Sequence, residues 1–313
     1  MLTVFTATLS PMLVMFLCMV IGFILNKKKL LPDSAATVLS KLENYVLVPS
    51  LIISTFMKYC TVASLAEQYK MILYCVLAVA VAIAAAYLLS GFFAKEKYQK
   101  AIYKYALTFG NFSFMGNAIV PAILGDEFLY DYLLFILPLN VAVYTWGITI
   151  LIPEGENKKS SFSNLLNPTV ISIVIGIVLG LSGVQQYVPA FITTTLSNFS
   201  ACMGPVAMVL TGFVIGDYNI RKLLKNKKVY IATALRLLVF PAIFVAMLIL
   251  LGADEKTVTL CFFAFATPLG LNTVIFPAAY GGDTATGASM AMISHTLCIV
   301  TIPLMYALLK TVV

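Results

Sequence analysis

The sequence has few charged residues for its length, and this scarcity sets its class. Only 11% of its 313 residues are charged, whereas 61% are hydrophobic. A water-soluble domain of this size needs a larger polar share to cover its apolar content. Nearly uncharged runs recur along the chain, each close to the roughly 20 residues with which a helix crosses about 30 Å of hydrocarbon. We therefore expect an all-α integral membrane protein.

Histidine, arginine and paired cysteines are also scarce, and each absence excludes a class of site. The single histidine is His295, and the six cysteines stand alone without a CxxC pair. Zinc sites and disulfide frameworks need closer spacing and more ligands, so we expect no metal, no cofactor, and cysteines that pack as small apolar residues. With only Arg221 and Arg236 as arginines, the net charge of +7 does not indicate a nucleic-acid surface.

Ten hydrophobic segments are long enough to be membrane spans. Within a few residues at each end they are 4–25, 37–57, 71–93, 102–124, 130–152, 168–183, 190–216, 229–251, 258–280 and 287–309. The sixth segment is short and the seventh is long, so their boundary is the least sharp. The first segment lacks the basic start of a signal peptide, and we expect it to remain in the protein.

The basic residues predict the orientation, because cytoplasmic loops of membrane proteins are rich in Lys and Arg. The odd-numbered loops carry fourteen of them, namely Lys27, Lys28, Lys29, Lys95, Lys97, Lys100, Lys104, Lys158, Lys159, Arg221, Lys222, Lys225, Lys227 and Lys228. The even-numbered loops and the C-terminal tail carry only Lys58, Lys70, Lys256 and Lys310. This asymmetry predicts a multi-pass plasma-membrane protein with both termini outside.

The two halves of the chain share a pattern. One offset of 156 residues relates Pro49 to Pro205, Pro121 to Pro277 and Gly125 to Gly281. The text itself recurs as GNAIVPAILGD in the fourth span and LNTVIFPAAYGGD in the ninth. Chance matches between apolar segments are the alternative. A real repeat would divide the chain into 1–156 and 157–313, with five spans each, and an odd number of spans inverts the second copy.

The fourth and ninth spans combine apolar residues with residues that disfavour helices. Pro121 and Pro277 each remove a backbone hydrogen bond, and lipid cannot satisfy the freed carbonyl. In carriers built from inverted repeats, two broken helices cross near the membrane midplane and direct half-helix ends at the substrate. Asn117 and Asn272 lie just before the two prolines and would face the interior. The simpler alternative is that the prolines only kink two packed helices.

Other polar residues within spans are weaker candidates for the binding site. Asn111 begins the apolar stretch of the fourth span, and Asn140 in the fifth would line the cavity or bond a neighbouring helix. Arg236 would either extend to the cytosolic interface or pair with a carboxylate. His295 would relay protons or pack with a hydrogen bond. Glu43, close to Lys41, is expected at the membrane boundary in reach of water.

Three segments resemble the auxin efflux carrier family. They are LLPDSAATVLSKLENYVLVPSLIISTF, GPVAMVLTGFVIG and YGGDTATGASMAMISHTLCIVTIPLMYALL, and the likeness covers nearly the whole chain. The family groups plant PIN-formed auxin exporters with bacterial permeases for malate, malonate and similar organic anions. The central loop, 153–167, is short compared with the long loop of many plant members, so the chain is similar to the short microbial type.

The resemblance implies a fold similar to that of the bile acid:sodium symporters. Ten helices would form two inverted five-helix repeats with crossed broken helices. Spans 1, 2, 6 and 7 would be a scaffold, and spans 3–5 and 8–10 a mobile transport domain. The scaffold face would be a surface for a homodimer.

Together these observations predict a secondary transporter that moves a small organic anion across the membrane by alternating access. The predicted substrate-binding residues are Asn117, Pro121, Asn272, Pro277, Asn111, Asn140 and Arg236. A proton or sodium would be the coupling ion. Alternatives are a symporter for bile-acid-like molecules, a cation/proton antiporter, a passive channel, a signalling partner and an intramembrane enzyme. The enzyme would need a buried nucleophile with its base or paired acids, which the spans lack.

Overall fold

The computed structural model describes residues 1–153, 166–279 and 281–313, and its regular elements are helices. The first half contains α1 (Leu2–Lys27), α2 (Ala35–Leu42), η1 (Glu43–Leu47), α3 (Val48–Tyr59), α4 (Val62–Phe93), α5 (Lys97–Thr108), η2 (Phe112–Gly116), α6 (Asn117–Leu124), α7 (Asp126–Phe135), α8 (Leu137–Ala142), η3 (Val143–Gly147) and α9 (Ile148–Leu151). The second half contains α11 (Pro168–Leu181), η4 (Val184–Tyr187), α12 (Ala190–Gly216), α13 (Ile220–Leu223), α14 (Lys227–Ala234), η5 (Leu235–Val239), α15 (Phe240–Leu250), α16 (Glu255–Ala266), α17 (Asn272–Ala279) and α18 (Ala285–Leu309).

Within the described residues, six continuous helices are long and apolar enough to cross a membrane. They are α1, the run from α2 to α3, α4, α12, the run from α14 to α15, and α18. The helices 126–135 and 137–151 form a seventh candidate that is bent by 46°. Pro138 stands at the start of α8, where its missing N–H and fixed φ favour a bend. The predicted all-α membrane protein is thus confirmed, with six or seven spans by length and composition.

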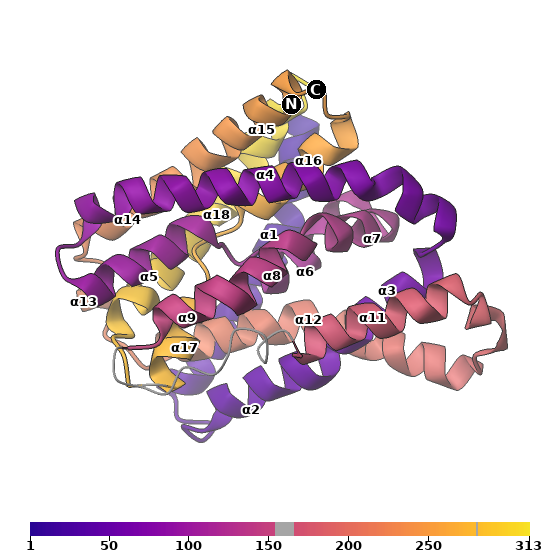
Figure 1. The fold of residues 1–313 in the computed structure, drawn as a ribbon. Coiled ribbons are helices and arrows are strands. Elements are labelled where there is room, and N and C mark those ends of the chain that lie inside the picture. The colour runs from indigo at the N-terminus through magenta and orange to yellow at the C-terminus, as the bar shows by residue number, and fades with distance from the viewer. Residues whose placement is uncertain (154–165, 280) are drawn as a thin grey trace.

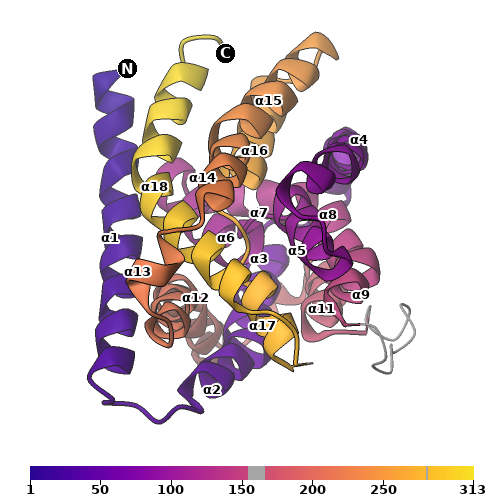
Figure 2. The ribbon, with the colours of Figure 1, turned by 90° about the vertical axis from the view of Figure 1, so that its left-hand side faces the viewer.

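Glycines let α1 and α12 pack backbone against backbone. A Cβ atom added at Gly212 would lie 1.8 Å from the carbonyl oxygen of Met19, and one added at Gly22 would lie 1.9 Å from that of Val209. Lipid provides no hydrophobic drive between helices, so close van der Waals contact through small residues holds them together. The helices α3 and α11 pack against each other beside α12, while α18 lies alongside α1 (Figure 2).

Two wide π-turns interrupt long helices just before prolines. η1 is followed by Pro49 and η5 by Pro241, and a π-turn accommodates a residue that cannot donate to the helix ladder. Glu43 is the first residue of η1, and its side chain is 0% exposed. The prediction that the side chain of Glu43 is in reach of water is therefore wrong. The helix turns this residue toward its neighbours, whereas Lys41 points out.

The segments predicted as the fourth and ninth spans are broken, but not at Pro121 and Pro277. Both prolines lie inside helices, α6 and α17, and the chain leaves helical geometry about ten residues earlier. One break runs over 109–111 between α5 and η2, and the other over 267–271 between α16 and α17. The prediction that the two helices break at these prolines is therefore wrong.

Local sequence explains both breaks. Thr267 has an extended ψ of 146° because it precedes Pro268, and a residue before proline is pushed out of the helical region. In the other break, Phe109 is extended and is followed by Gly110, which has no side chain to restrict it.

Both chain ends lie at the same end of the molecule, the top in Figures 1 and 2. Lys158 and Lys159, and the boundary between 156 and 157, lie outside the described residues.

Candidate functional site

The two breaks contact each other at the centre of the fold. Gly110 and Leu269 form an isolated antiparallel bridge, and the backbone N–H of Asn111 donates to the carbonyl of Pro268 at 2.7 Å. The N–H of Leu269 donates to the hydroxyl of Ser294 at 3.0 Å. Backbone groups freed by each break are thus satisfied by the other break or by α18, which is the condition for irregular backbone at membrane depth.

Arg236 lies against the two half-helices that enter this crossing. Its side chain is 0% exposed, and its guanidinium donates to four backbone carbonyls at 3.2–3.4 Å. The acceptors are Leu107 and Thr108 at the end of α5, and Ala264 and Thr267 at the end of α16. The C-terminal end of a helix carries about half a negative charge, so one guanidinium neutralises two such ends. Because the side chain is fully buried, the expectation that Arg236 extends to the cytosolic membrane interface is wrong.

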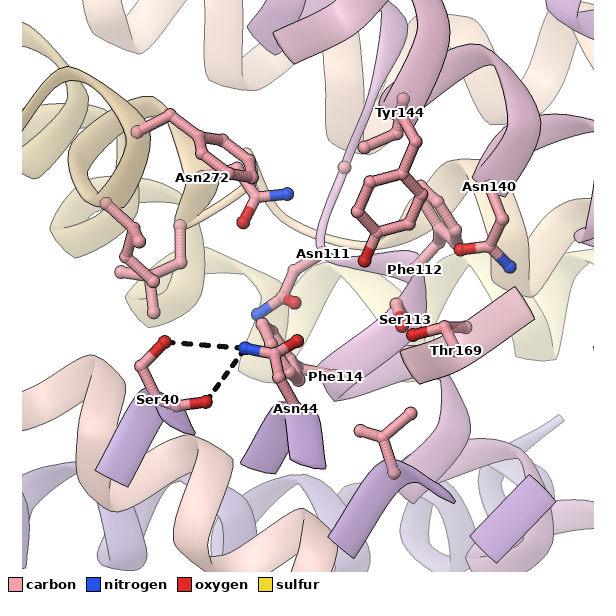
Figure 3. A pocket seen from close by; sticks show the side chains of 17 residues that line it. Ser40, Asn44, Asn111, Phe112, Ser113, Phe114, Asn140, Tyr144, Thr169 and Asn272 are labelled. Atoms are coloured by element: carbon pink, nitrogen blue, oxygen red, sulfur yellow. Dashed lines mark hydrogen bonds between the residues drawn. The ribbon is translucent and has the colours of Figure 1, made fainter. Parts of the chain in front are cut away.

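A cavity of about 160 Å³ lies at the crossing and is lined by residues of both breaks (Figure 3). Its lining consists of Ser40, Asn44, Val48, Gly110, Asn111, Phe112, Ser113, Phe114, Asn140, Val143, Tyr144, Thr169, Gly270, Leu271, Asn272, Ile275 and Phe276. Among these described residues, the polar groups are amides and hydroxyls, and none carries a formal charge. Drug-sized ligands fill clefts of roughly 300–1,000 Å³, so this cavity fits a smaller molecule.

Four asparagines gather at the cavity, and neighbours orient three of them. Asn272 donates to the hydroxyl of Tyr105 at 2.8 Å, and Asn44 donates to the carbonyl of Ser40 at 2.8 Å (Figure 3). The amide nitrogen of Asn111 lies 2.9 Å from Nε2 of His295.

His295 fixes the arrangement of the Asn111 amide. Its Nδ1 lies 2.7 Å from the carbonyl of Ala291, so Nδ1 carries the proton and Nε2 accepts from Asn111. An amide nitrogen has two hydrogens. Asn111 therefore keeps one N–H for a molecule in the cavity, which makes His295 an orienting residue.

Two helix beginnings also lie at the cavity. Phe112, Ser113 and Phe114 form the first turn of the helix 112–124, and Asn272 opens α17. The helix dipole places about half a positive charge at each beginning. In α17 the N–H groups of Thr273 and Val274 already donate to the carbonyls of Gly270 and Leu271, so the dipole and the asparagine amide are what this end offers. The cavity thus offers N–H donors and two positive helix ends without a cationic side chain. Such a site favours an anion.

The predicted site residues do not all come together. Asn111, Asn140 and Asn272 line the cavity, whereas Arg236 does not line it and instead donates to the backbone at the ends of α5 and α16. Asn117 and Pro121 line a second cavity of about 350 Å³ that also contacts α12. Val48 lines the first cavity, and Leu51, three residues farther along the same helix, lines the second. Pro277 lies inside α17 and does not line either cavity.

Sequence reasoning missed Ser40, Asn44 and Tyr105. A signal for two of them exists, because Ser40, Asn44 and Val48 are spaced four apart and share one face of the helix. Tyr105 has no comparable signal in the sequence. Its link to the site is a hydrogen bond from Asn272, which lies 167 residues away along the chain. Where the structure describes the chain, no group of three His, Cys, Asp or Glu side chains is close enough to hold a metal ion.

Comparison with known proteins identifies the family. The profile of a family described as "Membrane transport protein" matches residues 7–306. An uncharacterized transporter of Methanocaldococcus jannaschii is 25% identical over 307 residues, which cover 95% of this chain and 97% of the relative. The match confirms the resemblance drawn from the three sequence segments. The chain therefore belongs to the membrane transport protein family, the family of the auxin efflux carriers.

Proposed function

We propose that this chain is a secondary carrier that moves a small organic anion, a carboxylate, across the plasma membrane by alternating access. The observation that carries the proposal is the electrostatics of the crossing. Two positive helix beginnings and the asparagine amides line one small cavity, while Arg236, which is not among the lining residues, neutralises the two negative helix ends that meet at the crossing. An anion entering the cavity gains donors and meets no fixed negative side chain among its described lining residues.

The residues predicted from the sequence receive different roles in this proposal. Asn111, Asn140 and Asn272 hold the anion in the conformation seen here. Asn117 and Pro121 line the next part of the route, where the anion passes in the opposite conformation. Pro277 shapes α17, and Arg236 holds the crossing together and adds long-range attraction.

The architecture proposed from the sequence accompanies this function. Ten spans form two inverted repeats, 1–156 and 157–313, with both termini outside. Spans 1, 2, 6 and 7 form the scaffold, and spans 3–5 and 8–10 move. The packing of α12 against α1 and α3, and of α3 against α11, supports this scaffold group, and α1 also packs along α18 of the moving spans. The scaffold face would bind a second copy of the chain, and a proton or sodium would drive the cycle.

Hydrogen bonds to a charged oxygen set the expected affinity changes. Each is worth about 1.5–3 kcal/mol, and 1.4 kcal/mol corresponds to a factor of ten in affinity. Loss of one asparagine amide from the cavity should thus weaken binding about tenfold or more. The cation/proton antiporter is the weaker alternative, because no carboxylate is among the described residues that line this cavity.

Counterflow in proteoliposomes tests the proposal. Vesicles loaded with one unlabelled carboxylate are diluted into the labelled compound, and a panel of mono- and dicarboxylates is compared with neutral and cationic solutes. We expect exchange of at least one carboxylate. Asn272→Ala should raise its half-saturation concentration, while Asn117→Ala should lower the maximal rate and leave half-saturation near the wild-type value. Exchange of cations alone would contradict the proposal.

A further inference from the structure

Asn44 lines the anion cavity, but its amide is held differently from the other amides there. Its nitrogen donates to the backbone carbonyl of Ser40 at 2.8 Å and to the hydroxyl of the same residue at 3.4 Å. A backbone carbonyl only accepts hydrogen bonds, so this contact decides which end of the amide is the nitrogen. The nitrogen of Asn44 is therefore bound to its own helix and does not serve a molecule in the cavity.

The side-chain oxygen of Asn44 is left for the cavity. It accepts no hydrogen bond from the residues that the structure describes, since the bonds of this side chain are the two that its nitrogen donates. Figure 3 shows the nitrogen turned toward Ser40 and the oxygen turned away from it, among the other lining side chains. An unpaired amide oxygen in a cavity favours a ligand group that donates a hydrogen bond.

Asn111 supplies the complementary group from another part of the chain. Nε2 of His295 accepts one of its two amide hydrogens, so one N–H is left for the cavity. Asn44 lies in η1, whereas Asn111 precedes η2, and both line the same volume of about 160 Å³. A single small molecule that fills this volume contacts both residues. Its carboxylate would accept from Asn111 while a neighbouring group donates to Asn44.

A hydroxyl group suits the oxygen of Asn44 better than an ammonium group. The described lining residues carry no formal charge, and two helix beginnings make the cavity positive. An ammonium group would lose its water without gaining a negative partner, and the helix ends would repel it. A hydroxyl donates one hydrogen bond and brings no charge.

We propose that Asn44 selects carboxylates that carry a hydroxyl group on the carbon next to the carboxylate. Asn111 and the helix beginnings hold the carboxylate, and Oδ1 of Asn44 accepts from the hydroxyl. A carboxylate without the hydroxyl leaves Oδ1 unpaired and binds more weakly for that reason. The proposal rests on the proposed function, because it specifies the class of anion that the same cavity holds.

Counterflow with matched pairs of carboxylates tests the role of Asn44. Lactate is compared with propionate and tartronate with malonate, and any other carboxylate that is exchanged is compared with its own hydroxylated form. We expect the wild type to reach half-saturation at an about tenfold lower concentration of the hydroxylated member, because the other member lacks one hydrogen bond. Asn44→Leu has a side chain of similar size without an acceptor. In this variant both members should have the same half-saturation concentration.

Two further variants separate selection by Asn44 from a general effect on binding. Asn198 is exposed on α12 and does not line the cavity, so Asn198→Leu should keep both half-saturation concentrations of the wild type. Asn272→Ala removes a donor for the carboxylate that both members share. It should raise both half-saturation concentrations and preserve their ratio.

The possible outcomes distinguish this inference from the proposed function. Equal half-saturation for both members in the wild type would overturn the inference and leave the carrier in place, as would a preference that Asn44→Leu retains. Exchange confined to carboxylates without a hydroxyl would overturn it too. Absence of counterflow for every carboxylate would contradict the proposed function and the inference with it.

A wild-type competition experiment decides if Asn44→Leu does not fold. The competitor carries fluorine in place of the hydroxyl, since fluorine is close to a hydroxyl in size but donates no hydrogen bond. We expect the fluorinated carboxylate to compete no better than the member without a hydroxyl. Competition equal to that of the hydroxylated member would overturn the inference.

Discussion

Replacement of Arg236 by methionine should destabilise the crossing strongly. Methionine has a similar length but donates no hydrogen bond, so four backbone carbonyls at two helix ends would lose their donor. Interhelical hydrogen bonds in membrane proteins average about 0.6 kcal/mol each. Loss of charge at a helix end costs about 0.3–1 kcal/mol for each of the two ends. The sum is about 3–4 kcal/mol.

Thermal unfolding of the purified protein in detergent measures this loss. A thiol-reactive dye reports unfolding, because Cys75 and Cys261 are buried free cysteines that become reactive when the fold opens. One kcal/mol shifts the midpoint by about 2–4 °C in domains of 150–250 residues, so we expect a fall of at least about 5 °C. The melting midpoint of Arg236→Lys should lie between those of the wild type and Arg236→Met, because an ammonium keeps the charge but has fewer donors.

Arg221→Met is the matched control, because Arg221 is the other arginine of the chain and is exposed on α13. Its midpoint should stay close to that of the wild type. Equal midpoints for Arg236→Met and Arg221→Met would refute the role of Arg236 as the donor that holds two helix ends together.

Three further predictions concern backbone contact and orientation. Gly110→Ala should abolish transport, because the new Cβ would lie 2.5 Å from a guanidinium nitrogen of Arg236, whereas Gly91→Ala, with open space around it, should transport normally in the same uptake assay. Gly212→Ala should lower the melting midpoint relative to Gly91→Ala, since α1 would have to move away from α12; an unchanged midpoint would show that the contact is not needed. A cysteine in place of Lys225 should resist an impermeant thiol reagent in intact cells and react in inverted vesicles, and labelling from outside would reverse the proposed orientation.

The fold class was predictable because it follows from composition. The positions of the helix breaks were less predictable because they depend on contacts between distant segments. Scarce charge and long apolar runs were sufficient for an all-α membrane protein. The breaks were assigned to Pro121 and Pro277, yet both lie in helices. A proline inside an apolar helix is tolerated when a wide turn or a neighbour satisfies the freed carbonyl, whereas Gly110 and Pro268 stand where two chains must touch.

The candidate site was partly predictable for the same reason. Asn111, Asn140 and Asn272 meet at one cavity, and their amides within apolar spans were the signal. The partners of Arg236 are backbone carbonyls from two distant segments, which leave no trace in residue identities. Glu43 was misplaced because its distance from the end of a hydrophobic run does not show which face of the helix it occupies.

The central claim is that an anion binds at the crossing between the amides and the two helix beginnings. Asn272→Asp tests it most directly, because it keeps the shape of the side chain and places a negative charge in the cavity. We expect Asn272→Ala to raise the half-saturation concentration in carboxylate counterflow about tenfold, and Asn272→Asp to abolish exchange while the protein remains folded by its melting midpoint. Wild-type half-saturation in Asn272→Asp would contradict the account and place the anion elsewhere in the molecule.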